Sequence, residues 1–408
     1  MIKEKFLSHV FFKPKGTNPT PKADEYGIAK IGFDDNSNIY HREYNASILI
    51  EQLDQASRNL KIHKPSSFFE FKFSFQFNRG YSLERYFFKQ IRRSDFYTFN
   101  KSRAKAILLP ATPYMYHVAG SFLAKLYRAI FFEKKSRVNY KRRRKRIIEF
   151  FLQGAFKKWR FNNIKTKEVK TPILITSHIP GSGLLNDTAS DIQKDAILLA
   201  NSSDNKFGPF NFKKDVALVC NLDYKMPKYA YDVRAFSKLY GDRTHYSSFI
   251  GDIFDMRAQI YSKRTTQCKW VDHHIPFKDY VDIYANSKYY FHLPGHAEWS
   301  PRLFEGMFLG AIPVILYQKY ILPFSDILDW SSFAILVPES EWENVFDILS
   351  QIDEKRYNYL QNNLKSAIKH FCYHKKPIPG DAFYMTMLSI YIRQKNLSGI
   401  SSNTETQR

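Results

Sequence analysis

The chain has 408 residues, of which 44% are hydrophobic and 17% are aromatic. This composition is typical of a globular protein, excludes a disordered chain, and gives enough material for two ordinary domains. The chain carries 62 Lys and Arg residues against 39 Asp and Glu residues, a net charge of +23, which predicts an anionic partner such as a membrane surface, an acidic polymer or a nucleic acid.

Cysteine usage and hydropathy exclude further classes of protein. Cys220, Cys268 and Cys372 are scattered, and no CxxC pattern occurs, so the sequence offers no zinc signature and no disulfide framework. Few cysteines fit a reducing compartment. The sequence has no apolar run long enough to cross a bilayer and no proper signal-peptide core near residue 1. We therefore expect a cytoplasmic protein without a signal peptide or a transmembrane helix.

The first half predicts an irregular start followed by alternating strands and helices. Residues 1–65 are polar and are expected to form an irregular, at most lightly helical leader. Residues 68–77 alternate aromatic and polar side chains with the two-residue period of a strand. Further elements are expected as a helix at 81–92, a strand at 106–110, a helix at 119–132, a strand at 171–177 and an apolar run within 191–200.

Residues 134–160 combine basic side chains with apolar and aromatic ones at near-helical spacing. A cationic helix with an aromatic face typically lies on anionic lipid. We therefore predict contact with an anionic membrane or an acidic acceptor. The plain alternative is a surface helix packed on the N-terminal domain, and nucleic acid is the least favoured partner. The basic residues are Lys134, Lys135, Arg137, Lys141, Arg142, Arg143, Arg144, Lys145, Arg146, Lys157, Lys158 and Arg160.

Residues 201–214 are rich in turn formers and are the predicted linker, after which the alternation restarts at Val216. Alternating strands and helices indicate βαβ units and a parallel sheet, whose ligands bind at the carboxyl ends of the strands. The candidate loops end at Gly251, His296 and Tyr317. Strands are expected at 246–250, 289–293, 312–316 and 333–337, and helices at 254–262, 280–285, 301–309, 341–350 and 354–371.

Residues 291–330 are the most informative segment, because they predict a strand, a loop, a helix and a second strand. Ser300 suits the N-cap and Pro301 the first helical position. Arg302 and Glu305 then share one face of the helix. A helix N-terminus beside an arginine favours a phosphate, and the carboxylate one turn further on can hold ribose hydroxyls. A buried Arg–Glu pair that fixes one βαβ unit explains the same pattern equally well.

This segment resembles the C-terminal half of the exostosin-like glycosyltransferases. The residues that carry the resemblance are Ser300, Arg302, Glu305, Gly310, Pro313, Val314, Leu322, Pro323, Phe324, Ser325 and Trp330. Weaker similarities at residues 81–110, 213–218, 247–257 and 359–371 follow the order of the family. The resemblance therefore extends over roughly residues 67–375.

The resemblance implies an α/β protein of the GT-B type, with two Rossmann-like domains facing each other across a cleft. Residues 1–65 would form the leader, 66–208 the N-terminal acceptor domain, 209–375 the C-terminal nucleotide-sugar domain, and 376–408 a C-terminal helix and polar tail. The implied reaction is inverting transfer from a nucleotide-diphosphate sugar, most simply a UDP-sugar, to a hydroxyl of a polysaccharide or lipid-linked glycan. Animal and plant members usually carry an N-terminal anchor, so we expect a bacterial or viral relative or a trimmed chain.

The resemblance also implies roles for individual residues. Arg302, the backbone N–H groups around Ser300, and Arg257 after the glycine turn at Gly251 would neutralise the diphosphate. Glu305 would hold the ribose. GT-B transferases use such groups in place of a metal, so no metal and no cofactor is expected. The plain alternatives are a surface arginine for Arg257 and a structural ion pair for Glu305.

The general base is expected at His178, which follows the strand 171–177 and precedes the turn IPGSG. In the family this turn also carries polar residues that face the cleft. A loop histidine with satisfied hydrogen bonds is the competing interpretation. Asp252, Glu298 and Glu84 are lesser candidates.

Two other functions fit the same sequence. One is a GT-B transferase with a different donor, for example a GDP-sugar. The other is a non-catalytic module whose basic surface binds an anionic polysaccharide, a membrane or a nucleic acid. The presence of both Arg302 and Glu305 argues against the second function, because a module without activity needs neither residue.

Overall fold

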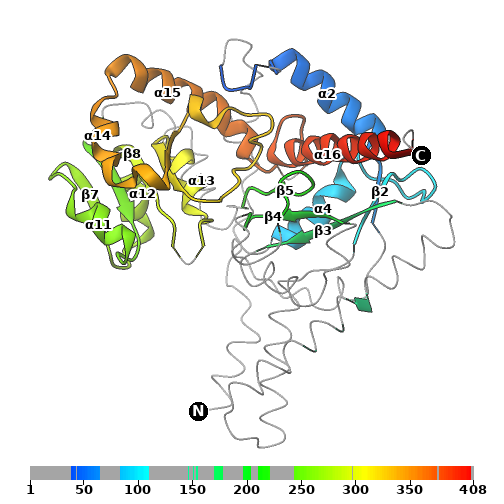
Figure 1. Ribbon diagram of the computed structural model, residues 1–408, viewed down its shortest axis with the longest axis horizontal. Coiled ribbons are helices and arrows are strands. Elements are labelled where there is room, and N and C mark those ends of the chain that lie inside the picture. Colours follow the sequence, from blue (N-terminus) through cyan, green and yellow to red (C-terminus); the bar gives the residue numbers. More distant parts are fainter. Residues whose placement is uncertain are drawn as a thin grey trace, which may run out of the picture.

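The computed structural model shows two α/β units side by side, with helices lying along the top of both (Figure 1). The residues that the structure describes are 38–42, 44–64, 83–109, 146, 150, 153–154, 170–177, 196–203, 210–220, 243–295, 297–374 and 376–405.

The first unit is built on a five-stranded sheet in which every pair of neighbours is parallel. The strands lie side by side in chain order, and their apolar residues are buried. Continuous apolar strands of this kind need cover on both faces of the sheet. The strands are β1 (Ile62–His63), β2 (Ala106–Leu108), β3 (Thr171–Thr176), β4 (Ile197–Ala200) and β5 (Val216–Ala217).

Three helices within the described residues belong to this first unit. Helix α2 (Ala46–Asn59) buries four residues at spacings of three and four, and the Asn45 side chain caps its start by accepting from the Ile48 N–H. Helix α4 (Leu83–Arg93) buries Phe87. Helix α16 (Ala382–Glu405) comes from the end of the chain and packs against α2 and β5, as the red and blue helices of Figure 1 show.

The second unit is also built on five parallel strands, in the order β10-β9-β8-β6-β7. From β6 the chain first adds β7 on one side and then β8, β9 and β10 on the other, so the strand order reverses between β6 and β8. Open parallel sheets bind ligands at such a switch point. The strands are β6 (His245–Ile250), β7 (Cys268–Val271), β8 (Ser287–His292), β9 (Ile312–Tyr317) and β10 (Ile335–Pro338). The helices are α11 (Met256–Ser262), α12 (Phe277–Ala285), α13 (Arg302–Phe308), η3 (Trp330–Ser332), η4 (Glu339–Asn344), α14 (Val345–Ser350), α15 (Glu354–Ala367) and η5 (Ile368–Phe371).

The predicted α/β class with two parallel sheets is confirmed. Three details differ from the sequence-based boundaries. Strand β5 pairs with β4, so the first sheet extends beyond residue 208. Helix α2 and strand β1 lie within the predicted leader. Helix α16 returns to the first sheet because its apolar residues complete that unit's core, as the burial of Phe383 and Leu388 shows. The predicted elements at 68–77 and 119–132 lie outside the described residues.

The chain passes from the second unit to the first through a crossover segment, which we define as residues 372–374 and 376–381. Immediately before it, Phe371 packs its ring against Phe304 and Trp330 of the second unit. Immediately after Cys372, the Tyr373 hydroxyl donates to the Val219 carbonyl of the first unit at 3.1 Å. The change of unit is therefore completed within two residues.

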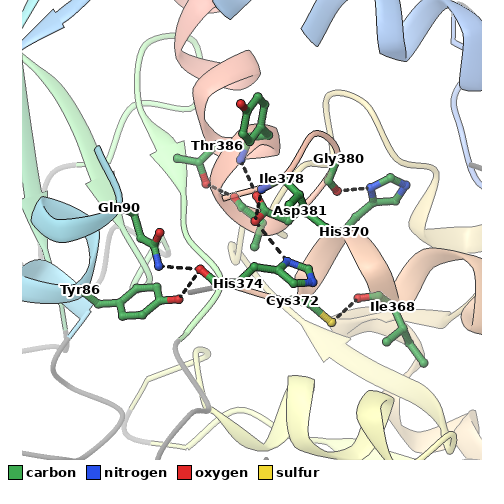
Figure 2. A network of polar contacts seen from close by, with 12 residues as sticks. Tyr86, Gln90, Ile368, His370, Cys372, His374, Ile378, Gly380, Asp381 and Thr386 are labelled. Carbon is green, nitrogen blue, oxygen red and sulfur yellow. Dashed lines mark hydrogen bonds and ion pairs between the residues drawn. The ribbon is translucent and has the colours of Figure 1, made fainter. Parts of the chain in front are cut away.

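A buried polar network fixes the crossover segment (Figure 2). The Asp381 carboxylate accepts from the N–H groups of Ile378 and Tyr384 and from Nδ1 of His374. From α4, the Tyr86 hydroxyl and the Gln90 amide both donate to the His374 carbonyl, at 3.0 and 2.7 Å. The network therefore caps α16 and ties it to α4 in one arrangement.

The loops at the carboxyl ends of the two sheets touch. Ser203, which follows β4, donates through its hydroxyl to the Ile321 carbonyl in the loop after β9, at 2.6 Å. The bond from Tyr373 to Val219 lies just beyond the end of β5. The ligand-binding edge of the second sheet is therefore in contact with the corresponding edge of the first sheet.

Candidate functional site

The switch point between β6 and β8 is bridged by one side chain, Arg257 of α11. Its Nη1 donates to the Asp252 carbonyl in the loop after β6, at 2.9 Å. Its Nε and Nη2 donate to the carbonyls of Pro294 and Leu293 in the loop after β8, at 3.0 and 3.1 Å. Arg257 therefore joins the two loops that form the mouth of the crevice.

Arg257 is buried, with 6% of its surface exposed, so the alternative of a surface arginine is wrong. Its guanidinium lies over the rings of Phe249 and Phe254, at 5.2 and 4.9 Å from their centres. Burial, and next the positive charge of Arg302, lower the pKa of Arg257 to about 10. The group still carries its charge at neutral pH, close to a second guanidinium.

Arg302, the first residue of α13, supplies that second guanidinium. Its Nη1 lies 2.9 Å from the point that a Cβ on Gly251 would occupy, so the arginine rests against the loop after β6. The side chain is half-buried. Among the residues that the structure describes, none forms a hydrogen bond or an ion pair with the Arg302 guanidinium. A structural ion pair with Glu305, the alternative left open by the sequence, is therefore not formed.

Ser300 is not the N-cap of α13, contrary to the sequence-based prediction. The helix begins at Arg302, and its cap is Pro301, which makes no side-chain bond. A tight first turn, in which the Leu303 N–H bonds to the Ser300 carbonyl, brings the Ser300 hydroxyl to the Arg302 N–H at 3.3 Å. Because α13 has only seven residues, its N-terminus does not by itself make an anion site.

Glu305 lies one turn further along α13 and has 5% of its surface exposed. Its carboxylate accepts a hydrogen bond from the Tyr280 hydroxyl of α12. Burial, and next the charge of Glu305, raise the pKa of Tyr280 and also that of Cys220, which follows β5 in the first unit. Glu305 therefore sits where the second unit meets the first. The Tyr280 ring is stacked on Phe277 at 5.9 Å.

His292, at the end of β8, belongs to the same cluster although sequence reasoning missed it. It is buried, and its Nε2 donates to the Glu298 carbonyl at 2.8 Å. Burial, assisted by the charges of Arg302 and Arg257, lowers the pKa of His292 to about 4. The imidazole is therefore neutral at physiological pH and adds no third positive charge. The signal in the sequence was its place at the carboxyl end of a buried strand.

Two of the lesser base candidates have structural roles. The Glu298 carboxylate accepts from the N–H groups of Gln318, Lys319 and Tyr320, at 2.8 to 3.1 Å, and so holds the loop after β9. Both carboxylate oxygens of Glu298 already accept hydrogen bonds from this loop, so Glu298 is poorly suited to take the proton of the sugar acceptor's hydroxyl. Buried Glu84 accepts from the Ser177 N–H at the end of β3, at 3.0 Å. Asp252 is exposed at the mouth of the crevice.

Two predictions fall largely outside the described residues. His178, the expected general base, is one of them. In the basic segment 134–160 the structure describes Arg146, Phe150, Gln153 and Gly154, all helical and exposed, with Phe150 exposed by 74%. Within the described ranges, no three acidic, His or Cys residues gather as they would around a metal ion. The helices described there include none with the length and apolar character of a membrane span.

Comparison with known proteins supports what the site suggests. A parallel α/β protein with paired cations at a sheet's switch point has the features of an enzyme that binds phosphorylated ligands. The Exostosin GT47 domain matches residues 39–352. The chain belongs to this glycosyltransferase family, as the resemblance predicted.

Three relatives from plants each match part of the chain. A probable glycosyltransferase of Arabidopsis thaliana is 38% identical over 119 residues, which is 29% of this chain and 25% of the relative. A probable glucuronosyltransferase of Physcomitrium patens is 36% identical over 95 residues, 23% of this chain and 21% of the relative. A probable beta-1,4-xylosyltransferase of Arabidopsis thaliana is 34% identical over 95 residues, 23% of each chain.

The match spans about a quarter of the length of these relatives. Because all of these relatives come from plants, they give no support to the expected bacterial or viral origin.

Proposed function

We propose that this chain transfers a sugar from a nucleotide-diphosphate donor, most simply a UDP-sugar, to a hydroxyl of a polysaccharide or lipid-linked glycan, with inversion. The observation that carries the proposal is the half-buried guanidinium of Arg302, which has no partner among the described residues and lies close to the buried cation of Arg257. Two adjacent positive charges without a bonded carboxylate are unfavourable unless an anion binds there. The names of the relatives, which include a glucuronosyltransferase and a xylosyltransferase, fit such an anion being a nucleotide diphosphate.

The reaction follows from where charge develops. The acceptor oxygen attacks the anomeric carbon, the bond from that carbon to the diphosphate oxygen breaks, and the acceptor proton passes to a base, for which His178 is the candidate. Negative charge grows on the leaving diphosphate, and a pre-positioned cation stabilises it more in the transition state than in the ground state. Arg302 supplies that cation, and the Glu305 carboxylate accepts a hydrogen bond from a ribose hydroxyl.

A nucleotide screen tests this proposal without knowledge of the acceptor. Thermal unfolding is measured with UDP, GDP and their sugars, and a ligand at 100 times its dissociation constant stabilises the fold by about 2.7 kcal/mol. We expect UDP to stabilise the parent and to stabilise Arg302→Ala only about half as much, as an about tenfold weaker affinity requires. The same shift in Arg302→Ala would remove Arg302 from the site. A shift with GDP alone would support the alternative donor, and no shift with any nucleotide would support a non-catalytic module.

We further propose that transfer needs no metal ion, because Arg302, with Arg257 close by, neutralises the diphosphate. Transfer should therefore be unchanged by EDTA. Activity that disappears on chelation and returns with Mn²⁺ or Mg²⁺ would show that a metal shares this role.

The basic segment 134–160 is our candidate for peripheral contact with anionic membrane or an acidic acceptor. Its described residues are exposed, including the ring of Phe150. Binding to anionic vesicles should fall as salt rises, and replacement of Arg142, Arg143, Arg144 and Arg146 by Gln should weaken it by about 1 kcal/mol per charge. Loss of transfer to a soluble acidic acceptor, without vesicle binding, would assign the segment to the acceptor. Nucleic acid is the least favoured partner.

A further inference from the structure

Arg257 and Arg302 stand in different relations to their surroundings, although both are cations at the same switch point. Three nitrogens of Arg257 each donate to a backbone carbonyl, and those carbonyls come from the loops on both sides of the crevice. The Arg302 guanidinium, half-buried, makes no such bond within the described residues. The first arginine is committed to the protein, and the second is available to a ligand.

Two glycines show how closely the arginines are seated. A Cβ on Gly295, in the loop after β8, would lie 2.5 Å from Nη2 of Arg257. A Cβ on Gly251, in the loop after β6, would lie 2.9 Å from Nη1 of Arg302. Each loop therefore forms the seat of one guanidinium, and Arg257 ties the two loops together through their carbonyls.

We propose that Arg257 is a positioning residue, which sets the place of Arg302 by clamping the loops of Gly251 and Gly295 and does not itself contact the donor. The inference rests on the proposed function, because it assigns how the diphosphate site is held. Two of the five N–H groups of Arg257 remain after these three bonds. The side chain is nevertheless only 6% exposed and its guanidinium lies over the rings of Phe249 and Phe254, so its present orientation offers little of it to a donor. Turning the guanidinium towards a phosphate would break these bonds and leave the buried Leu293 carbonyl without its donor, which is unfavourable.

The test is a double-mutant cycle on the preference for UDP over UMP, measured as the ratio of their dissociation constants. Removal of Arg302 should lower this preference about tenfold, equal to 1.4 kcal/mol. Arg257→Lys should lower it severalfold in the parent and leave it unchanged in Arg302→Ala, because a residue acting through another is silent once that residue is gone. Reductions that multiply in the double variant would show direct contact and overturn the inference.

Gly295→Ala repeats the test without removing either charge. The added methyl would collide with Arg257. This variant should therefore lower the preference for UDP over UMP severalfold in the parent and leave it unchanged in Arg302→Ala. The matched control is Gly154→Ala, since nothing lies within 4 Å of a Cβ at Gly154. A normal preference in Gly295→Ala would contradict the positioning role even if Arg257→Lys fails to fold. A parent that binds UDP no better than UMP would instead overturn the proposed function.

Discussion

The switch point of the second sheet and the crossover segment are both buried and polar, but their hydrogen bonding differs. In the crossover segment Asp381 accepts three hydrogen bonds and the His374 carbonyl accepts two. At the switch point, no described residue pairs with the Arg302 guanidinium. Protein interiors almost always satisfy their polar groups. The crossover network therefore contributes to stability, whereas the unpaired cation indicates a ligand site.

The largest expected effect separates activity from stability at the switch point. Arg302→Ala should lower the rate of transfer by about 10² to 10³, because the developing diphosphate charge loses its stabilising cation. Its free energy of unfolding should change by less than about 0.5 kcal/mol, since no described bond is lost. Turnover and urea unfolding measure the two quantities. Arg264→Ala, at an exposed arginine of the same unit, is the control and should change neither. Full turnover in folded Arg302→Ala would show that the unpaired guanidinium has no role in transfer.

The reverse pattern is expected in the crossover segment. Asp381→Ala should lower the free energy of unfolding by about 2 to 4 kcal/mol, because it removes the cap of α16 and leaves buried donors unpaired. Affinity for the nucleotide should stay within twofold. Asp353→Ala is the matched control, since Asp353 is exposed and caps α15 by accepting from the Arg356 N–H; it should lose only about 1 kcal/mol. Equal losses in the two variants would show that burial of the network adds nothing.

The two regions also share an acid sensitivity. Burial lowers the pKa of His292 at the switch point to about 4 and that of His370 before the crossover to about 3. The unfolded chain binds protons near pH 6.5 and the folded chain does not, so this stability is complete above pH 6.5 and declines as pH falls. The contribution of each histidine to the free energy of unfolding should fall by on the order of 2 kcal/mol between pH 6.5 and 5.

Urea unfolding at pH 7, 6 and 5 measures that decline, and His370→Gln should remove its share of the slope. An unchanged slope in this variant would mean that His370 takes up its proton in the folded state as easily as in the unfolded state.

The smallest expected effect concerns one bond between the crossover segment and α4. Tyr86→Phe removes the hydroxyl that donates to the His374 carbonyl, while Gln90 continues to donate to the same oxygen. The free energy of unfolding should fall by about 1 kcal/mol. Tyr97→Phe, whose hydroxyl forms no hydrogen bond within the described ranges, is the control. A loss above 3 kcal/mol would show that the two donors act as one unit.

The second sheet could be predicted well because its strands are apolar and its helices amphipathic. Strand β7 was missed because Lys269 and Trp270 interrupt the apolar pattern in only four residues. Helix α2 was missed although Ala46, Leu49, Leu53 and Ala56 carry a helical period. A closer count of that period would have found it.

The site was predictable in part. Arg302 and Glu305 could be selected because they lie within one short motif. The bonds of Arg257 to the carbonyls of Leu293 and Pro294 join residues 36 and 37 positions apart. Such contacts arise from the strand order of the sheet, which local spacing does not encode. The crossover network depends on still longer contacts, for example 288 positions from Tyr86 to His374.

The return of α16 to the first sheet has a consequence for the order in which the protein is made. Strands β1 to β5 leave the ribosome long before α16, which covers them and whose Gln394 side chain donates to Lys105 and Thr171 at the start of β2 and β3. Part of the core of the first unit therefore stays uncovered until α16 has been made. The strands and helices of the second unit come from one stretch, residues 245–371, and can pack together earlier. Maturation of the two halves thus runs in the opposite order to their appearance in the chain.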